Sequence, residues 1–377
     1  MRVYADHGST TPVDPRVVAA MLPYFSETFG NASSLHAWGQ SAREAVDTAR
    51  EQVARAIRCA PAEVVFTSGA TESDNFAVGG AALGNEDRGR HAVVSAVEHH
   101  AVLEPCRFLE SRGVEVTYIR VDRTGRVDPD DVRRALRDDT VLVSVMHANN
   151  ELGTVQAIAE IGRMVRERGI LMHSDAAQSV GILPVDVNAL RVDLLSVSAH
   201  KRYGPKGVGA LYVRKGARLQ RVQHGGAHER NRRAGTENVS GIVGFGEALR
   251  LAAELMDTEA ERLRAFSHRL RGALRAIPGA HLNGDPVDGL PGTVSVSFEG
   301  TDSEALLMAL DLRGIAASSG SACTSGSLEP SHVLRAVGLP PDLAKGTVRF
   351  SLGRGTAEAD VEYLTQVVPE VVATLRR

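Results

Sequence analysis

Residues 194–207 read LLSVSAHKRYGPKG, an apolar stretch that runs into a polar turn carrying Lys201. Only four of the 43 lysines and arginines in the chain are lysines, so an amine at this place stands out. An amine can lose its proton, attack a carbonyl and form a Schiff base, which a guanidinium cannot do. Most loop lysines are simply solvated, but the neighbouring motifs favour a chemical role for Lys201.

A second apolar strand, Ile170 to His173, is followed by Ser174 and Asp175. Ligands of open parallel sheets bind at the carboxyl ends of the strands, so Asp175 and Lys201 are expected to face one crevice. A lysine for the aldehyde and an aspartate for the pyridinium nitrogen are the pair that pyridoxal 5'-phosphate (PLP) requires. The two strand ends therefore predict a PLP site.

The composition is that of an ordinary globular protein long enough for two domains: 377 residues, 43% hydrophobic and 24% charged. A net charge of -3 offers no electrostatic case for direct nucleic-acid binding. No apolar run is long enough to span a membrane, which predicts a cytoplasmic protein.

The cysteines are three in number, Cys59, Cys106 and Cys323, and none forms a Cys-x-x-Cys pair. An odd number without such a pair disfavours a disulfide framework or a zinc site. No metal is predicted.

Strand and helix patterns alternate from Val64 to Val213, which predicts an α/β fold with right-handed crossovers and a mainly parallel sheet. Before them we expect an extended arm, one helix from Pro15 to about Phe25 and a long amphipathic helix ending at Ile57.

A glycine-rich region at 241–246 is followed by a charged pattern that predicts a helix over about 258–277. The remainder reads as a smaller α/β domain. We therefore expect a large domain over 15–257, and a small domain made of 1–14 and 258–377.

Residues 67–73 (TSGATES) join a buried strand to a helix, where free N–H groups and the helix dipole favour an anion. The alternative is a plain glycine turn with Thr71 and Ser73 as helix caps. Because Lys201 predicts PLP, phosphate binding is the better interpretation of this turn. The residues predicted to contact the phosphate are Ala70, Thr71, Ser198 and His200.

Three further polar residues follow strand ends. His99 is predicted to stack on the cofactor ring and move protons, although it could instead cap the next helix. The amide of Asn150 can donate to a substrate carboxylate or to the cofactor phenolate oxygen, for which Gln178 is the better partner.

Cys323 lies at the centre of residues 317–327, a stretch of small residues. It has no apolar neighbours to be buried with, unlike Cys106 on its amphipathic helix. An accessible loop that presents a nucleophilic thiolate explains it better.

The sequence closely resembles the cysteine desulfurases, NifS/IscS-like members of the class V aminotransferase fold, over essentially the whole chain. The matching segments are 29–36, 67–73, 98–99, 147–153, 174–178, 198–201, 233–238, 318–327 and 349–354. Residues 318–330 resemble the long-loop subgroup, which hands sulfur to protein acceptors. Gly8, Ser9 and His228 depart from the residues usual in the family.

The resemblance implies a PLP-dependent transferase of fold type I, aspartate-aminotransferase-like, with a seven-stranded sheet in its large domain. It implies that Lys201 and His99 are catalytic and that the Cys323 thiolate attacks the sulfur of L-cysteine. L-alanine and a persulfide on Cys323 would result. Arg349 would bind the substrate carboxylate, helped by Asn150 and Asn31.

The resemblance also implies a homodimer in which Thr236 reaches the phosphate bound by the neighbouring chain. The sulfur acceptor would be an iron–sulfur scaffold, a tRNA-thiolation carrier or a DNA-modification partner, and Cys323 would help to ligate an iron–sulfur cluster during transfer.

Other functions remain open at this stage. A selenocysteine lyase or aminotransferase on the same fold would use Lys201 and Asp175 without needing Cys323. A metal hydrolase built from histidines lacks the expected ligand spacing. A non-enzymatic adaptor should have lost Lys201 or Cys323, and the chain has both.

Overall fold

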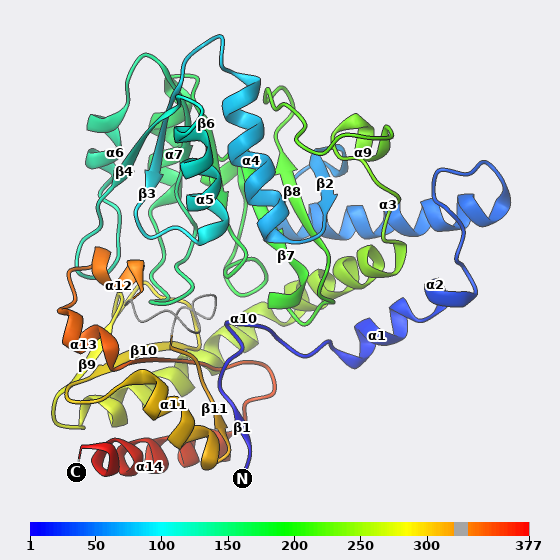
Figure 1. Cartoon of the computed structure of the whole chain (residues 1–377). Helices are drawn as coiled ribbons and strands as arrows, with labels where there is room; N and C mark the ends of the chain where they lie inside the picture. The colour runs from blue at the N-terminus through cyan, green and yellow to red at the C-terminus, as the bar shows by residue number, and fades with distance from the viewer. Residues whose placement is uncertain (320–330, 377) are drawn as a thin grey trace.

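The computed structural model describes residues 1–319 and 331–376. Its centre is a seven-stranded sheet in the order β2-β8-β7-β6-β5-β3-β4 (Figure 1). The strands are β2 (Val64–Thr67), β3 (His91–Ser95), β4 (Glu115–Ile119), β5 (Thr140–Ser144), β6 (Leu171–Asp175), β7 (Leu194–Ser198) and β8 (Gly209–Val213). Only β8 runs antiparallel to its two neighbours. The predicted mainly parallel sheet of seven strands is confirmed.

Helices cover both faces of this sheet, as its fully buried central strands require. Alternate strand residues point to opposite faces, so Val143 and Leu142 of β5 belong to two different apolar clusters. One cluster is closed by α3 (Ala37–Ile57), α6 (Pro129–Ala135) and α7 (Ile158–Glu167). The other is closed by α4 (Ala70–Gly84) and α5 (His100–Glu110).

The longest helix, α10 (Val239–Arg275), corrects the prediction of a helix over 258–277. It begins well before residue 258 because its glycines are packing positions and not breaks. A Cβ at Gly246 would lie 2.7 Å from the Cα of Ala49 on α3, so only glycine allows the two helices to approach this closely. Figure 1 shows α10 running from the large sheet to the second layer of structure.

The N-terminal segment also differs from the prediction of one helix over residues 15–25. It forms α1 (Pro15–Met21) and α2 (Pro23–Ser26), because Pro23 has no N–H to continue the first helix. The extended arm before them is confirmed as the strand β1 (Val3–Tyr4), which pairs in parallel with β11 (Ile315–Ala316).

A second apolar core surrounds a three-stranded antiparallel sheet in the order β12-β10-β9. Its strands are β9 (Ala280–Asn283), β10 (Thr293–Phe298) and β12 (Thr347–Ser351), with α11 (Ser303–Leu312) and α14 (Glu358–Leu375) packed against them. The strand β9 and the helix α13 (Pro341–Lys345) were not predicted. The remaining short elements are η1 (Pro61–Glu63), α8 (Val187–Leu190), η2 (Ala199–Lys201), α9 (His228–Asn231) and α12 (His332–Ala336). The domain limits at 257 and 258 stay a prediction and fall inside α10.

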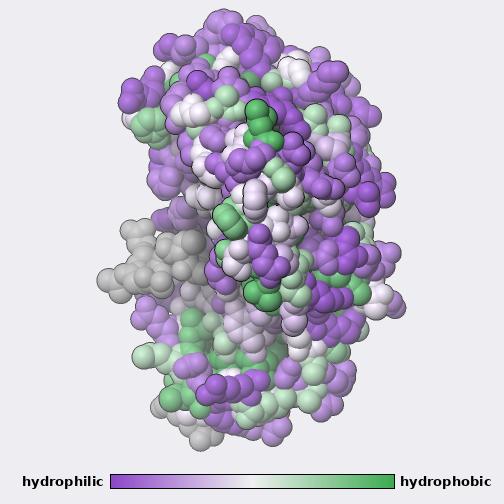
Figure 2. Space-filling model, turned by 90° about the vertical axis from the view of Figure 1, so that its right-hand side faces the viewer, coloured by the Kyte–Doolittle hydropathy of each residue, from purple (hydrophilic) through white to green (hydrophobic). Residues whose placement is uncertain are grey.

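The surface carries several exposed apolar side chains among polar ones (Figure 2). Five of them lie within residues 22–38, around α2 and the start of α3: Leu22, Phe25, Phe29, Leu35 and Trp38. In the described residues, no helix is long and apolar enough to cross a membrane.

Candidate active site

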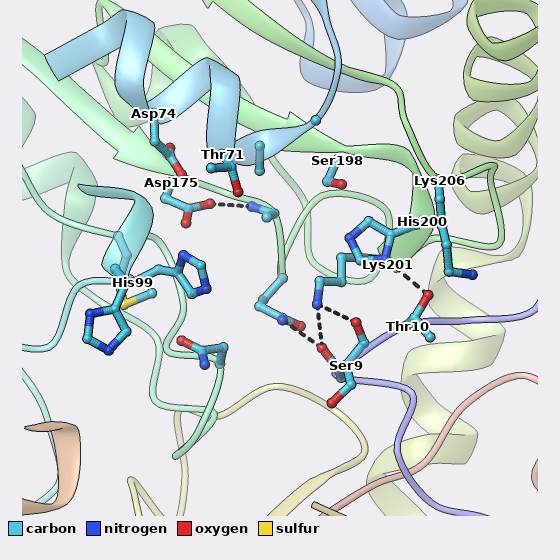
Figure 3. Close-up of a pocket in the computed structure, with 18 of the residues that line it drawn as sticks. Ser9, Thr10, Thr71, Asp74, His99, Asp175, Ser198, His200, Lys201 and Lys206 are labelled. Carbon is cyan, nitrogen blue, oxygen red and sulfur yellow. Dashed lines mark hydrogen bonds between the residues drawn. The ribbon is translucent and has the colours of Figure 1, made fainter. Parts of the chain in front are cut away.

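A cavity of about 560 Å³ opens at the carboxyl ends of β6 and β7. Asp175 and Lys201 both line it, so the two residues expected to share a crevice do so (Figure 3). The sequence-predicted residues in its wall are Ala70, Thr71, His99, Asn150, Asp175, Gln178, Ser198, His200, Lys201 and Arg349.

Lys201 reaches the cavity from the short helix η2, directly after β7. Its Nζ donates hydrogen bonds to the carbonyl oxygens of Gly8 (2.8 Å) and Ser9 (2.7 Å). Gln178 donates from Nε2 to the same Gly8 oxygen at 3.0 Å. The N-terminal arm is therefore part of the site, and it holds the lysine amine in the cavity (Figure 3).

Asp175 is the last residue of β6 and is 6% exposed. Burial raises the pKa of its carboxyl, while the N–H of Ala177 and the nearby Lys201 act in the opposite direction. A buried carboxylate with few compensating charges is stabilised strongly by a cation placed against it. Asp175 therefore fits the protonated ring nitrogen of PLP.

The N-terminus of α4 faces the same cavity through Gly69, Ala70 and Thr71. Gly69 is the N-cap residue, with φ at 153°, and no side chain caps the helix there. The N–H groups of the first turn and the helix dipole therefore favour an anion at this end of the cavity. Ser198 and His200 line the cavity as well, and Nδ1 of His200 lies 3.1 Å from the Thr10 hydroxyl.

His99 combines the two roles that the sequence left open. Its Nδ1 accepts a hydrogen bond from the N–H of Ala101 at 3.1 Å and so caps α5. The ring also lines the cavity, and burial lowers its pKa. A neutral ring that accepts at Nδ1 carries its proton on Nε2.

Arg349 projects from β12 into the cavity wall and is 2% exposed. One terminal nitrogen, Nη2, donates to Oδ1 of Asp6 (3.0 Å) and to Oγ of Ser9 (2.7 Å). The other, Nη1, donates to the carbonyl oxygen of Asn150 at 2.6 Å. These contacts hold the guanidinium in place, ready for a carboxylate in the cavity.

Two predicted residues lie outside this cavity: Asn31 and Thr236 are both exposed in the single chain. Cys323 falls outside the described residues. Among residues 1–319 and 331–376, no group of three or more histidines, cysteines or carboxylates is arranged to hold a metal ion. His147 and His173 instead pair with serine hydroxyls.

Asp74 and Glu151 also line the cavity and were not predicted. Asp74 lies three residues after Thr71, on the same face of α4, and this spacing could have pointed to it. Glu151 follows Asn150 in a loop, where no periodicity indicates which side chain turns inward.

Residues 3–364 match the aminotransferase class-V family. A cysteine desulfurase IscS from Dictyoglomus turgidum is 50% identical over 375 residues, which cover 99% of this chain and 95% of the relative. The chain belongs to the class-V aminotransferases and, within them, to the IscS-type cysteine desulfurases. This family is PLP-dependent, so PLP is the cofactor that Lys201 and Asp175 fit.

Solved structures agree with this assignment. A NifS-like protein superposes with a TM-score of 0.93 at 38% identity, covering 99% of this chain and 100% of its own. A structure described as SspA in complex with cysteine has a TM-score of 0.83 at 37% identity, covering 94% of this chain and 100% of its own.

Proposed function

We propose that this cysteine desulfurase converts L-cysteine to L-alanine in the cavity of Lys201 and Asp175, and that it keeps the sulfur as a persulfide on Cys323. The observation that carries the proposal is that Lys201, Asp175 and Arg349 line one cavity, although three separate strands bring them there. They provide an amine, an anion for the cofactor ring and a cation for the substrate carboxylate.

Bound PLP supplies an electron sink for the α-carbon of the substrate. Lys201 and Asp175 would hold its aldehyde end and its ring nitrogen, and the first turn of α4 would hold its phosphate. Arg349 orients the substrate by pairing with its carboxylate. The Lys201 amine, held beside the arm, is the group placed to move the α-proton, and Nε2–H of His99 is a second donor in the same wall.

Cys323 then completes the reaction in this proposal. Its thiolate attacks the sulfur of the substrate, so that a sulfur–sulfur bond forms while the carbon–sulfur bond breaks. The electron pair of the broken bond stays on the carbon, where a proton completes the methyl group of alanine. No external oxidant is needed, because the sulfur leaves as a persulfide.

The proposal includes a homodimer in which Thr236 completes the phosphate site of the neighbouring chain. Two features support it: Thr236 and Asn31 are exposed and outside the cavity of their own chain, and apolar side chains are exposed within residues 22–38. The proposed acceptor of the sulfur is a protein, either an iron–sulfur scaffold or a thiolation carrier, with Cys323 as a ligand to the cluster during transfer. Membership of the IscS-type cysteine desulfurases fits a sulfur-donating role.

Analysis of the products tests the proposed reaction. The PLP-loaded protein, given L-cysteine and dithiothreitol, is expected to release L-alanine and sulfide in equal amounts, and Lys201→Ala is expected to release neither. Formation of a keto acid in place of alanine, when an amino-group acceptor is supplied, would identify an aminotransferase. A strong preference for selenocysteine over cysteine would identify a selenocysteine lyase.

A further inference from the structure

Asp74 is a fully buried carboxyl group directly behind the cofactor site. It lies on α4, is 0% exposed and lines the cavity. Neither of its oxygens meets hydrogen-bond geometry with a described residue, although the Ser196 hydroxyl lies close enough to oppose the rise in its pKa. Figure 3 shows its carboxyl directed toward Asp175. An ionised carboxylate without hydrogen bonds is very unfavourable in such a place.

In the part of the chain that the structure describes, no cation in contact with Asp74 compensates for a charge on it. The basic atom in contact with it is Nε2 of His173, 3.5 Å from Oδ1. That ring is paired with the hydroxyls of Ser144 and Ser196, and burial lowers its pKa to about 3. His173 is therefore neutral at physiological pH and offers no positive charge.

The other titratable groups around Asp74 are two carboxyls, Asp175 and Glu98, with His99 and Lys201 beyond Asp175. Glu98 is also 0% exposed, and its Oε1 accepts a 2.6 Å hydrogen bond from the N–H of Met146. Burial and the neighbouring Asp175 raise the pKa of both Asp74 and Glu98. Closely spaced buried carboxyls cannot all ionise, so protons remain on some of them.

We propose that Asp74 is a positioning residue that keeps its proton and donates it in a hydrogen bond to the carboxylate of Asp175. Asp175 then holds the negative charge of the cluster and faces the PLP ring nitrogen. The inference rests on the assignment of Asp175 to that nitrogen in the proposed function.

The donated hydrogen bond has a defined chemical effect. A hydrogen bond to the charged form of Asp175 stabilises that form. Asp175 is then a weaker competitor for the proton on the ring nitrogen, and the ring keeps the positive charge that makes it an electron sink. Without the donor, Asp175 becomes more basic and the shared proton moves toward it.

Two substitutions of Asp74 test whether it acts as a neutral hydrogen-bond donor to Asp175. Asp74→Asn keeps the size and a neutral hydrogen-bond donor, whereas Asp74→Ala removes the donor. Asn75→Ala, on the exposed side of the same helix, controls for loosening of α4. Each protein is loaded with PLP, and two quantities are measured: the pH dependence of the cofactor absorption and the PLP dissociation constant.

We expect Asp74→Asn and Asn75→Ala to keep the wild-type spectral transition, and Asp74→Ala to shift it and to weaken PLP binding about tenfold. A transition in Asp74→Ala that matches wild type would overturn the proposal, as would an equal shift in Asp74→Asn and Asp74→Ala.

The proton itself is observed by infrared spectroscopy of the holoenzyme with ¹³C-carboxyl aspartate. A protonated-aspartate band at neutral pH that disappears in Asp74→Asn supports the proposal, and its absence from wild type refutes it. This measurement needs no turnover, so it stays informative even if the proposed reaction proves wrong.

Discussion

Glu151 is a carboxyl group buried in the wall of the cavity, 3% exposed. It accepts a 2.6 Å hydrogen bond from the hydroxyl of Ser331. Burial raises its pKa from 4.5 to about 7, against the opposing effects of Ser331 and Arg349. Glu151 therefore changes its charge near physiological pH, beside the arginine proposed to bind the substrate.

The raised pKa predicts that Glu151 lowers the stability of the fold as the pH rises. Between pH 4.5 and 7 the folded state binds more protons than the unfolded state, so the free energy of unfolding falls with pH in that window. Glu151→Gln has no carboxyl group to titrate and removes this loss. The free energy of unfolding of the variant, relative to that of wild type, should therefore rise by about 3 kcal/mol from pH 5 to pH 8.

Urea unfolding of both proteins at several pH values measures this gain. Glu160→Gln, on the exposed side of α7, is the control and should change little. A wild-type stability that follows that of Glu151→Gln at every pH would contradict the raised pKa.

The sequence was sufficient to place the residues that follow strand ends. Lys201, Asp175 and His99 all follow apolar strands, and the parallel sheet brings such ends to one edge. Asp74 and Glu151 were missed because their importance comes from burial, which depends on packing between distant segments.

A buried ion pair anchors the segment before Thr236. Arg50 of α3 makes two hydrogen bonds of 2.7 Å to Glu229, and both side chains are 3% exposed. Glu229 also accepts from the N–H of Phe66 at 2.9 Å. Three successive residues, Glu229, Arg230 and Asn231, have φ of 44°, 55° and 63°, a left-handed conformation that side chains disfavour. The ion pair holds this turn in place.

Arg50→Met is expected to destabilise the protein by about 3 kcal/mol, because it leaves the Glu229 carboxylate buried without its partner. Arg218→Met, which removes a surface pair with Asp87, should cost about 1 kcal/mol or less. Urea unfolding compares the two variants, and equal losses would show that the buried pair does not anchor the turn.

Element types were predicted better than element ends. The alternating strands of the large sheet have short apolar runs bounded by turns, and all seven were expected. The start of α10 was misplaced because Gly241, Gly244 and Gly246 look like helix breakers in isolation. Gly244 and Gly246 are there for tertiary packing, because Met21 and α3 lie close to the helix at these two positions, whereas Gly241 leaves room for the side chain of the N-cap residue Asn238.

In the proposed dimer, each active site is built from residues of both chains. Mixing Lys201→Ala and Thr236→Ala chains should therefore produce mixed dimers with one doubly defective site and one intact site. Activity should recover to about one quarter of wild type in a random mixture, because half of the dimers are mixed and each has one intact site. Recovery no greater than the average of the two parent homodimers would refute the shared site.

Cys323 is proposed to receive the sulfur, and locating the persulfide after one turnover tests this proposal. Protein treated with L-cysteine is alkylated and digested, and the labelled peptide is identified by mass spectrometry. We expect the persulfide on Cys323 in wild type, Cys59→Ser and Cys106→Ser, together with one L-alanine per persulfide.

Cys323→Ser should bind PLP and L-cysteine but form no persulfide and little alanine, since a serine hydroxyl is not ionised at neutral pH. A persulfide on Cys59 or Cys106, or full alanine production by Cys323→Ser, would show that Cys323 is not the sulfur acceptor of the reaction.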